Sequence, residues 1–440
     1  MRIKIFTLIA VTLFSQLSLA APKIQHWTTS NGARVYFVPA PELPIVDVQI
    51  VFDAGGARDG DKPGLALLTN GLMPEGAGKY DAHKISQTFD SLGAQFGNSS
   101  HRDMSVLSIR TLSDPEVMTP ALEMLTTILT QPTFPKAAFE RERKRLLVSI
   151  EQRKQSPSAL AGEAFYKAVY NSHPYAQLPG GQKDTVNAIT LDDISAFYDK
   201  YYIANNAVIA IVGDLDRAKA ENVVNSLVGR LPEGTAVGDL PNVPALTDAK
   251  TISIKHPSAQ THILVGAPGV KRGDTDYFAL YVGNHILGGS GLVSRLSDEI
   301  REKRGLSYST YSYFNPMRKN GPYTLGLQTR NESAEEALKV MRDELQKFID
   351  KGPTEKELTA AQKNITGGFP LRISSNKKII SYIGVIGFYG LPLDYLDTFN
   401  EKIQAVTVKD IKDAYQRRVQ HDKMITVLVG GNGIKDHEKN

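Results

Sequence analysis

An internal repeat limits the fold of this chain more than any other feature of its sequence. Gly213 ends an apolar run in IVGDLD, and Gly430 ends a similar run in VLVGGNG. Pro135 and Pro353 each precede an amphipathic segment, as prolines at helix starts often do. The two glycines lie 217 residues apart and the two prolines 218 apart. Two independent pairs with nearly the same offset predict a duplicated chain with two homologous domains.

A stretch rich in proline and glycine separates the two predicted domains. Residues 231–250 read LPEGTAVGDLPNVPALTDAK and have no apolar periodicity, which is typical of a linker. The 440 residues are also too many for one ordinary core. We therefore expect an N-terminal domain at 21–230 and a C-terminal domain at 251–440.

Strand and helix patterns alternate within each half. Apolar runs predict strands, and amphipathic runs with capping residues predict helices. In the first half the expected strands are 33–40, 46–56 and 104–112, and the expected helical segments are 64–73, 81–92 and 115–153. The second half opens with TISIKH and THILVGAPG and follows the same order. This order predicts an α+β fold, in which each domain has an antiparallel sheet with helices packed on one face.

The first 20 residues have the pattern of a secretory signal peptide. Arg2 and Lys4 precede an apolar run at 5–13, and a small-x-small site ends at Ala20. Cleavage after Ala20 predicts a periplasmic or secreted protein. The alternative is an N-terminal amphipathic helix of a cytosolic protein. A membrane-spanning helix needs about 20 apolar residues. No other segment approaches that length, so we expect no membrane span after signal removal.

Composition and motif content exclude several classes of protein. The chain has no Cys, hence no disulfide scaffold and no thiolate chemistry. Without the signal, 49 Lys and Arg face 47 acidic residues, and this net charge of +2 argues against nucleic acid as a partner. No two histidines are four residues apart, as a helical metal site requires, and there is no Gly-x-Ser-x-Gly elbow for serine hydrolysis.

Residues 173–216 carry a series of motifs that point to a family. HPYAQLPGGQKDTVNAITLDDISAFYDKYYIANNAVIAIVGDLD contains His-Pro-Tyr, an Asp-Asp-x-x-x-Phe-Tyr helix, Tyr-Tyr, Asn-Asn and a Gly-Asp strand end. On these motifs the chain resembles the pitrilysin/insulinase/mitochondrial-processing-peptidase family over essentially its whole mature length. The resemblance implies two homologous α+β domains forming half of a clamshell, which pairs with another half around a peptide chamber.

The zinc motif of that family is absent. In the family, His-x-x-Glu-His on one helix and a later Glu hold zinc and activate water. Within GLALLTNGLMPEGA at 64–77 the corresponding positions are Leu67, Asn70 and Gly71, and the later ligand falls at Val148. None of these side chains is a metal ligand or a base of the kind required. The resemblance therefore implies no metal or other cofactor in this chain, with zinc expected in a partner subunit.

A second motif, SGLVSRLSDEIREKRGLSYSTYSYF, occupies residues 290–314. Val293, Leu296 and Ile300 are spaced three and four apart, which predicts an amphipathic helix. Gly305 follows as a left-handed cap, and a strand is expected at 307–314.

In the family, an Arg near the end of this helix and a Tyr seven residues later reach across the chamber to substrate at the zinc. The matching residues are Arg301 and Tyr308. A guanidinium can donate to a peptide carbonyl, and a phenol can donate to the developing oxyanion. Alternatively, Arg301 complements a helix dipole and Tyr308 is an ordinary strand aromatic.

Gly288, Gly289 and Gly291 stand just before this helix. They occupy the place of the glycine-rich substrate loop in the non-catalytic subunit of mitochondrial processing peptidase, much shortened. The resemblance implies that they contact or gate substrate. Alternatively they form a flexible turn at the helix start, and no Lys-Ser/Thr follows to make a phosphate loop.

These observations favour a zinc-free subunit of an exported heteromeric zinc metallopeptidase. A homologous partner would carry His-x-x-Glu-His, and this chain would add Arg301, Tyr308 and half of a chamber for peptides or unfolded polypeptides. The alternative is a structural or peptide-binding scaffold with no role in catalysis, which has no chemical need for the Arg/Tyr pair. A peptidase with metal bound elsewhere is disfavoured by the histidine spacing.

Overall fold

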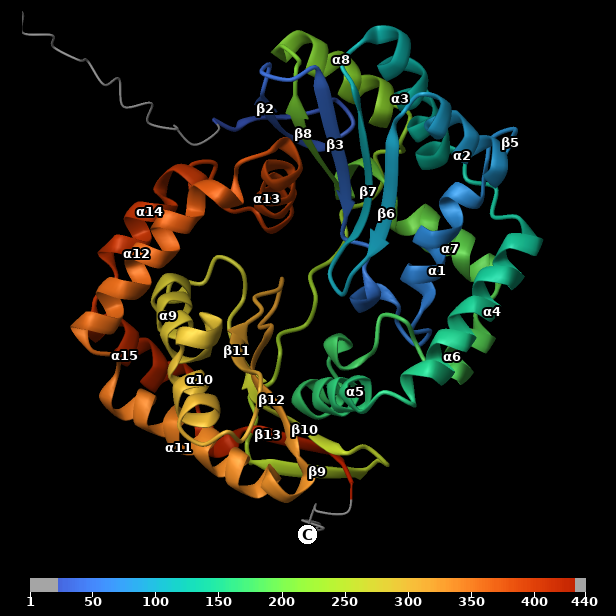
Figure 1. Ribbon diagram of the computed structural model, residues 1–440. Coiled ribbons are helices and arrows are strands. Elements are labelled where there is room, and N and C mark those ends of the chain that lie inside the picture. The colour runs from blue at the N-terminus through green and yellow to red at the C-terminus, as the bar shows by residue number, and fades with distance from the viewer. Residues whose placement is uncertain (1–22, 432–440) are drawn as a thin grey trace, which may run out of the picture.

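The computed structural model describes residues 23–431, which form two large sheets with their helices at opposite ends of a ring-shaped chain (Figure 1). A small third sheet consists of β4 (Gly76–Ala77) and β5 (Tyr80–Asp81). The predicted signal peptide, residues 1–20, lies outside the described residues and stays a prediction. None of the helices in the described part is long and apolar enough to cross a membrane.

The first sheet contains six strands. Their order is β1 (Gln25–Thr28), β2 (Arg34–Pro39), β8 (Ala207–Gly213), β3 (Ile45–Phe52), β7 (Ser105–Leu112) and β6 (Gln95–Ser100). Every neighbouring pair is antiparallel except β2 and β8, which run parallel.

The second sheet repeats the first sheet but has no counterpart of the edge strand β1. Its order is β11 (Thr310–Phe314), β12 (Pro322–Arg330), β10 (Gln260–Pro268), β13 (Ile425–Gly430) and β9 (Lys250–Lys255). Again one pair, β13 and β9, is parallel and the others are antiparallel. Gly213 and Gly430 end the equivalent strands β8 and β13, so the repeat seen in the sequence is a repeat of structure.

Fifteen α-helices are assigned among the described residues. Those of the first half are α1 (Leu65–Leu72), α2 (Ala82–Ser91), α3 (Pro115–Thr130), α4 (Lys136–Arg153), α5 (Pro157–Tyr170), α6 (Lys183–Ala188), α7 (Leu191–Tyr201) and α8 (Arg217–Val228). Those of the second are α9 (Tyr277–Asn284), α10 (Arg295–Ser297), α11 (Ala334–Lys351), α12 (Glu355–Arg372), α13 (Asn376–Tyr389), α14 (Tyr395–Ala405) and α15 (Val408–Arg418). The α+β class with two homologous sheet-and-helix units is thus confirmed.

The helical segment expected at 115–153 is two helices. α3 ends at Thr130 and α4 begins at Lys136, with Pro132 and Pro135 between them. Proline lacks a backbone N–H and disfavours helical geometry in the residue before it, so this pair interrupts the helix.

Each half of the chain also gives one helix to the sheet of the other half. α13 packs on β8, β3 and β2 of the first sheet, and α5 packs on β13 and β10 of the second (Figure 1). α5 and α13 start 219 residues apart, so they are equivalent elements of the repeat. The first sheet is therefore covered on one face by its own helices and on the other by α13.

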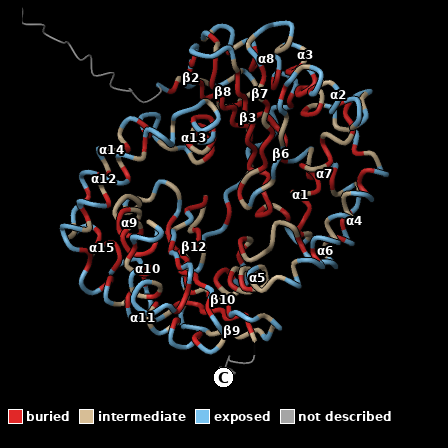
Figure 2. The backbone as a smooth tube through the Cα atoms, in the orientation of Figure 1, coloured by how far each residue is buried: buried red, intermediate tan, exposed pale blue. Residues whose placement is uncertain are grey.

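Side-chain alternation along β8 shows both faces of the first sheet. Ile209 and Ile211 lie in the core formed with the first half's own helices. Val208, Ala210 and Val212 lie in the core that contains α13. The whole strand is buried, as the red tube shows in Figure 2. A continuous apolar run is what a strand covered on both faces requires.

The exchanged helix α13 approaches the first sheet through a glycine. A Cβ added to Gly387 would lie 2.6 Å from Cγ1 of Val208 and 2.7 Å from the ring of Tyr36. Both side chains are buried, so they have little room to move. Gly387 therefore fixes how closely α13 packs on β8 and β2.

A buried carboxylate links the two halves beside this contact. Asp103 Oδ1 accepts a hydrogen bond from the Tyr175 hydroxyl at 2.6 Å. Its Oδ2 accepts from the Tyr389 hydroxyl at 2.9 Å and from the backbone N–H of Arg318 at 2.7 Å. Burial raises the pKa of both tyrosines, so they remain donors at neutral pH. The first half supplies Asp103 and Tyr175, and the second supplies Arg318 and Tyr389.

Gly387→Ala should lower the free energy of unfolding by about 1–3 kcal/mol, because the added methyl overpacks the α13–sheet contact. The matched control is Gly367→Ala in α12, where an added Cβ meets nothing within 4 Å. That change should stabilise by about 0.5–1 kcal/mol through helix propensity. Urea unfolding measures both, and equal stability of the two variants would contradict the close packing.

Candidate functional site

Helix α1 holds the positions of the missing zinc motif, and a buried carboxylate fixes its start. Asp59 accepts hydrogen bonds from the backbone N–H groups of Gly64 at 2.8 Å and Ala66 at 2.7 Å. Burial raises the pKa of Asp59 to about 7, although these two amides act to lower it. These two hydrogen bonds anchor the N-terminus of the helix.

The side chains on α1 serve packing and hydrogen bonding instead of metal binding. Asn70 is buried, and its Nδ2 donates to Ser105 Oγ at 2.6 Å. Ser105 Oγ in turn shares a hydrogen bond of 2.7 Å with the hydroxyl of Tyr202. Asn70 therefore ties α1 to β7 and to the residue that follows α7, at the position where the family has its general base.

The other three positions lack any ligand atom. Leu67 is half-buried, and a Cβ added to Gly71 would meet nothing within 4 Å. Val148 on α4 is 51% exposed. α1 and α4 pack on each other, so the structure keeps the helix pair while the side chains give no zinc site. Across residues 23–431 there is no group of three or more His, Cys, Asp or Glu side chains placed to hold a metal.

An open strand edge lies beside α1. β6 is the last strand of the first sheet and contacts α1, and Asn98 on it donates to the carbonyl of Asn70 at 2.7 Å. An unpaired edge can accept an extended peptide through backbone hydrogen bonds. The sequence analysis did not predict this strand, because QFGNSS lacks apolar alternation. The flanking Gly93 and the strand β7 after it were the only available signal.

The segment after Gly289 differs from the expected regular helix. A 3₁₀ turn at Gly291–Val293 leads into α10, and a π-helical turn follows at Asp298–Glu302. Leu296 and Ile300 are buried as expected, but Val293 is 83% exposed, so its predicted place on the apolar face was wrong. The 3₁₀ turn breaks the helical period and turns Val293 outward. Gly305 has a φ of 60°, which confirms the left-handed cap.

Arg301 and Tyr308 lie together. The Arg301 guanidinium stands over the Tyr308 ring, with Cζ 4.7 Å from the ring centroid, and Arg301 Nε lies 3.4 Å from a Glu302 carboxylate oxygen. Tyr308 is 81% exposed. No hydrogen bond joins its hydroxyl to any of the described residues. The cation–π contact orients the pair and leaves the phenol hydroxyl accessible.

The chain does not bring this pair to its own α1. In Figure 1, α1 lies on one side of the ring, and α10 and β11 lie on the other side. The Arg/Tyr pair and the degenerate zinc positions are therefore separate surfaces of one chain.

The three glycines have distinct surroundings. Gly288 is buried, and an added Cβ would lie 2.7 Å from the backbone N of Ser312 in β11. This close approach gives Gly288 a structural reason to be glycine. Gly289 and Gly291 are exposed, and their contact with substrate stays a prediction.

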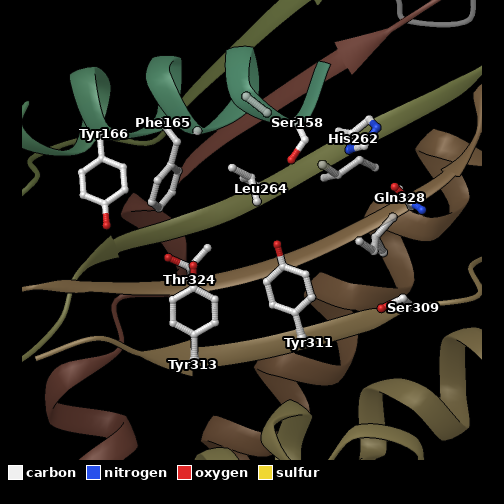
Figure 3. A pocket seen from close by; sticks show the side chains of 14 residues that line it. Ser158, Phe165, Tyr166, His262, Leu264, Ser309, Tyr311, Tyr313, Thr324 and Gln328 are labelled. Atoms are coloured by element: carbon white, nitrogen blue, oxygen red, sulfur yellow. The ribbon is translucent and has the colours of Figure 1, made fainter. Parts of the chain in front are cut away.

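A cavity of about 430 Å³ lies between α5 and the strands β10, β12 and β11 (Figure 3). Tyr311 and Tyr313 project into it from the edge strand β11, opposite Ser158, Phe165 and Tyr166 of α5. Burial, and to a lesser extent the nearby His256, lower the pKa of His262 at one end. The cavity offers aromatic surface and hydroxyl groups next to an open strand edge, which suits peptide side chains.

Family models match two long segments of the chain. The model described as "Insulinase (Peptidase family M16)" matches residues 34–178, and "Peptidase M16 inactive domain" matches residues 188–365. A non-peptidase homolog of Helicobacter pylori is 26% identical over 98% of this chain and 99% of its own length. An uncharacterized zinc protease of Streptomyces coelicolor is 27% identical over 88% of this chain and 86% of its own.

Two solved structures are similar to this chain over most of its length. The peptidase M16 inactive domain from Pseudomonas fluorescens superposes with a TM-score of 0.90 at 41% identity, covering 93% of this chain and 98% of that one. A protease from Helicobacter pylori shares the fold with a TM-score of 0.86 at 20% identity, covering 93% and 99%. The chain belongs to the insulinase (M16) peptidase family, as a member without the family's zinc-binding motif.

Proposed function

We propose that the chain is the non-zinc-binding subunit of an exported heteromeric zinc metallopeptidase. A homologous partner supplies the zinc and the general base. This chain supplies half of the peptide chamber, with Arg301 and Tyr308 reaching the substrate at the partner's metal. The signal-peptide pattern at 1–20 supports export to the periplasm or beyond.

The exposed Arg301–Tyr308 pair is the single observation that carries this proposal. A tyrosine that is 81% exposed adds little to the stability of a fold. Its ring is held under the Arg301 guanidinium, and its hydroxyl has no hydrogen-bonding partner among residues 23–431. A guanidinium and an exposed phenol on the same surface can both donate to a carbonyl oxygen that gains negative charge during peptide cleavage.

The second candidate function is a structural or peptide-binding scaffold with no role in catalysis. The hydrogen bonds of Asn70 favour it, because they show that α1 now has a structural role. The name of the Helicobacter pylori relative, a non-peptidase homolog, is compatible with both readings.

The purified mature chain should contain no stoichiometric zinc, because Leu67, Asn70, Gly71 and Val148 provide no set of ligands. Metal analysis by mass spectrometry of protein prepared without chelator measures this. About one tightly held zinc per chain would contradict the proposal.

The chain should form a stable complex with a homologous chain that bears His-x-x-Glu-His. Permanent protein–protein interfaces commonly bury more than about 2,000 Å² of surface in total. Half of a clamshell leaves a surface of this kind exposed until its partner binds. Gel filtration of the co-expressed chains should give one peak containing both. Two separate peaks at micromolar concentration would argue against pairing.

Tyr308→Phe should lower the kcat of the assembled complex by about 100-fold, as loss of one oxyanion donor does. The unfolding free energy should change by no more than about 0.5 kcal/mol, because the hydroxyl is exposed. Tyr80→Phe is the matched control. Lys79 lies over the Tyr80 ring at 5.4 Å, so this site has a similar cation–π pair on a different surface. An assembled Tyr308→Phe complex with unchanged kcat and KM would favour the scaffold.

A further inference from the structure

A second cavity, of about 140 Å³, lies between α9, α14 and the loop that joins α13 to α14. Its walls are mostly aromatic and aliphatic and are formed by Tyr277, Phe278, Leu391, Pro392 and Tyr395. Gly273 and three charged residues complete the lining, namely Arg272, Lys402 and Asp274. The cavity is distinct from the Arg301–Tyr308 pair and from the cavity of Figure 3.

Neither cation has a carboxylate partner in the described part of the chain. The Nε of Arg272 is buried and makes no hydrogen bond, and its guanidinium lies 5.7 Å from the Tyr389 ring centroid. Lys402 Nζ lies 5.7 Å from the ring centroid of Phe278. A buried donor without an acceptor is costly, and an anion in the cavity would remove that cost.

The nearby acidic residues do not neutralise these cations, because they are paired with other arginines. Asp274 binds Arg418 at 3.1 Å, and Asp276 binds Arg417 at 2.8 Å and Arg418 at 2.7 Å. The charges of these two carboxylates and two guanidiniums therefore balance. The positive charges of Arg272 and Lys402 are left without a negative partner.

We propose that this cavity binds a small apolar carboxylate, either a free aromatic acid or the C-terminal residue of a peptide. The carboxylate accepts hydrogen bonds from Arg272 and is attracted by Lys402, because guanidinium and carboxylate geometries match. The apolar body packs between Tyr277, Phe278 and Tyr395, where ring contacts add to burial. The site adds a binding function that is independent of the proposed peptidase role.

The cavity also adjoins the contact between the two halves. Tyr389, whose ring faces Arg272, donates its hydroxyl to Asp103. Because the cavity exists only in the folded chain, a bound anion should also raise the melting temperature.

Isothermal titration calorimetry of the mature chain tests the site with three probes. They are phenylacetate, N-acetyl-phenylalanine and N-acetyl-phenylalanine amide. For ligands of this size we expect saturable binding of a carboxylate with a Kd on the order of 1 mM. The amide should not bind measurably. Binding of phenylacetate alone identifies a free acid as the ligand class, and binding of N-acetyl-phenylalanine identifies a peptide C-terminus.

Variants separate the site from general charge effects. Arg272→Gln and Lys402→Gln should each weaken carboxylate binding by about tenfold or more. Lys363→Gln, at an exposed position of α12, removes the same charge outside the cavity and should leave binding unchanged. Lys402 is partly exposed, so its variant should fold even if Arg272→Gln does not.

Three results would overturn the proposal. They are no saturable binding of either carboxylate at about ten times the expected Kd, equal binding of the amide, and undiminished affinity in Lys402→Gln.

Discussion

The exchange of α5 and α13 between the two halves is the constraint on which the rest of the structure depends. Each sheet has a face that its own helices leave open, and the equivalent helix of the other half covers it. Gly387 sets the depth of the α13 contact, and Asp103 binds donors from both halves beside it. The halves therefore share one continuous structure, and the surfaces they carry have fixed relative positions.

Because the surfaces of the two halves have fixed relative positions, Arg301 and Tyr308 do not reach α1 of the same chain. α1 and β11 stand on opposite sides of the ring, and the exchanged helices hold them there (Figure 1). The proposed function therefore requires another chain to present a metal-bound substrate to Arg301 and Tyr308. The separation of these two surfaces is the physical reason for proposing a composite site between two chains.

Helix α1, which carries the positions of the missing zinc motif, has a structural role in this chain. Asn70 keeps a polar group at the buried position of the base, and the Ser105 and Tyr202 hydroxyls satisfy it. The amide cannot deprotonate water, but it holds α1 to β7. Open space beside Gly71 marks where a ligand side chain would stand. By contrast, the exposed phenol of Tyr308 has no such structural partner.

The sequence by itself determined what depends on local pattern: the repeat, the α+β class, the missing zinc ligands and the left-handed cap at Gly305. These follow from residue type and spacing, which act within a few residues or recur at a fixed offset. The tertiary structure alone decided the parallel pair in each sheet, the exchange of α5 and α13, and the outward turn of Val293. It also decided the edge strand β6 and the unpaired cations at Arg272 and Lys402. These features depend on contacts between residues far apart in the chain, because strand partners and the cover of a second sheet face are set by packing and leave no local periodicity.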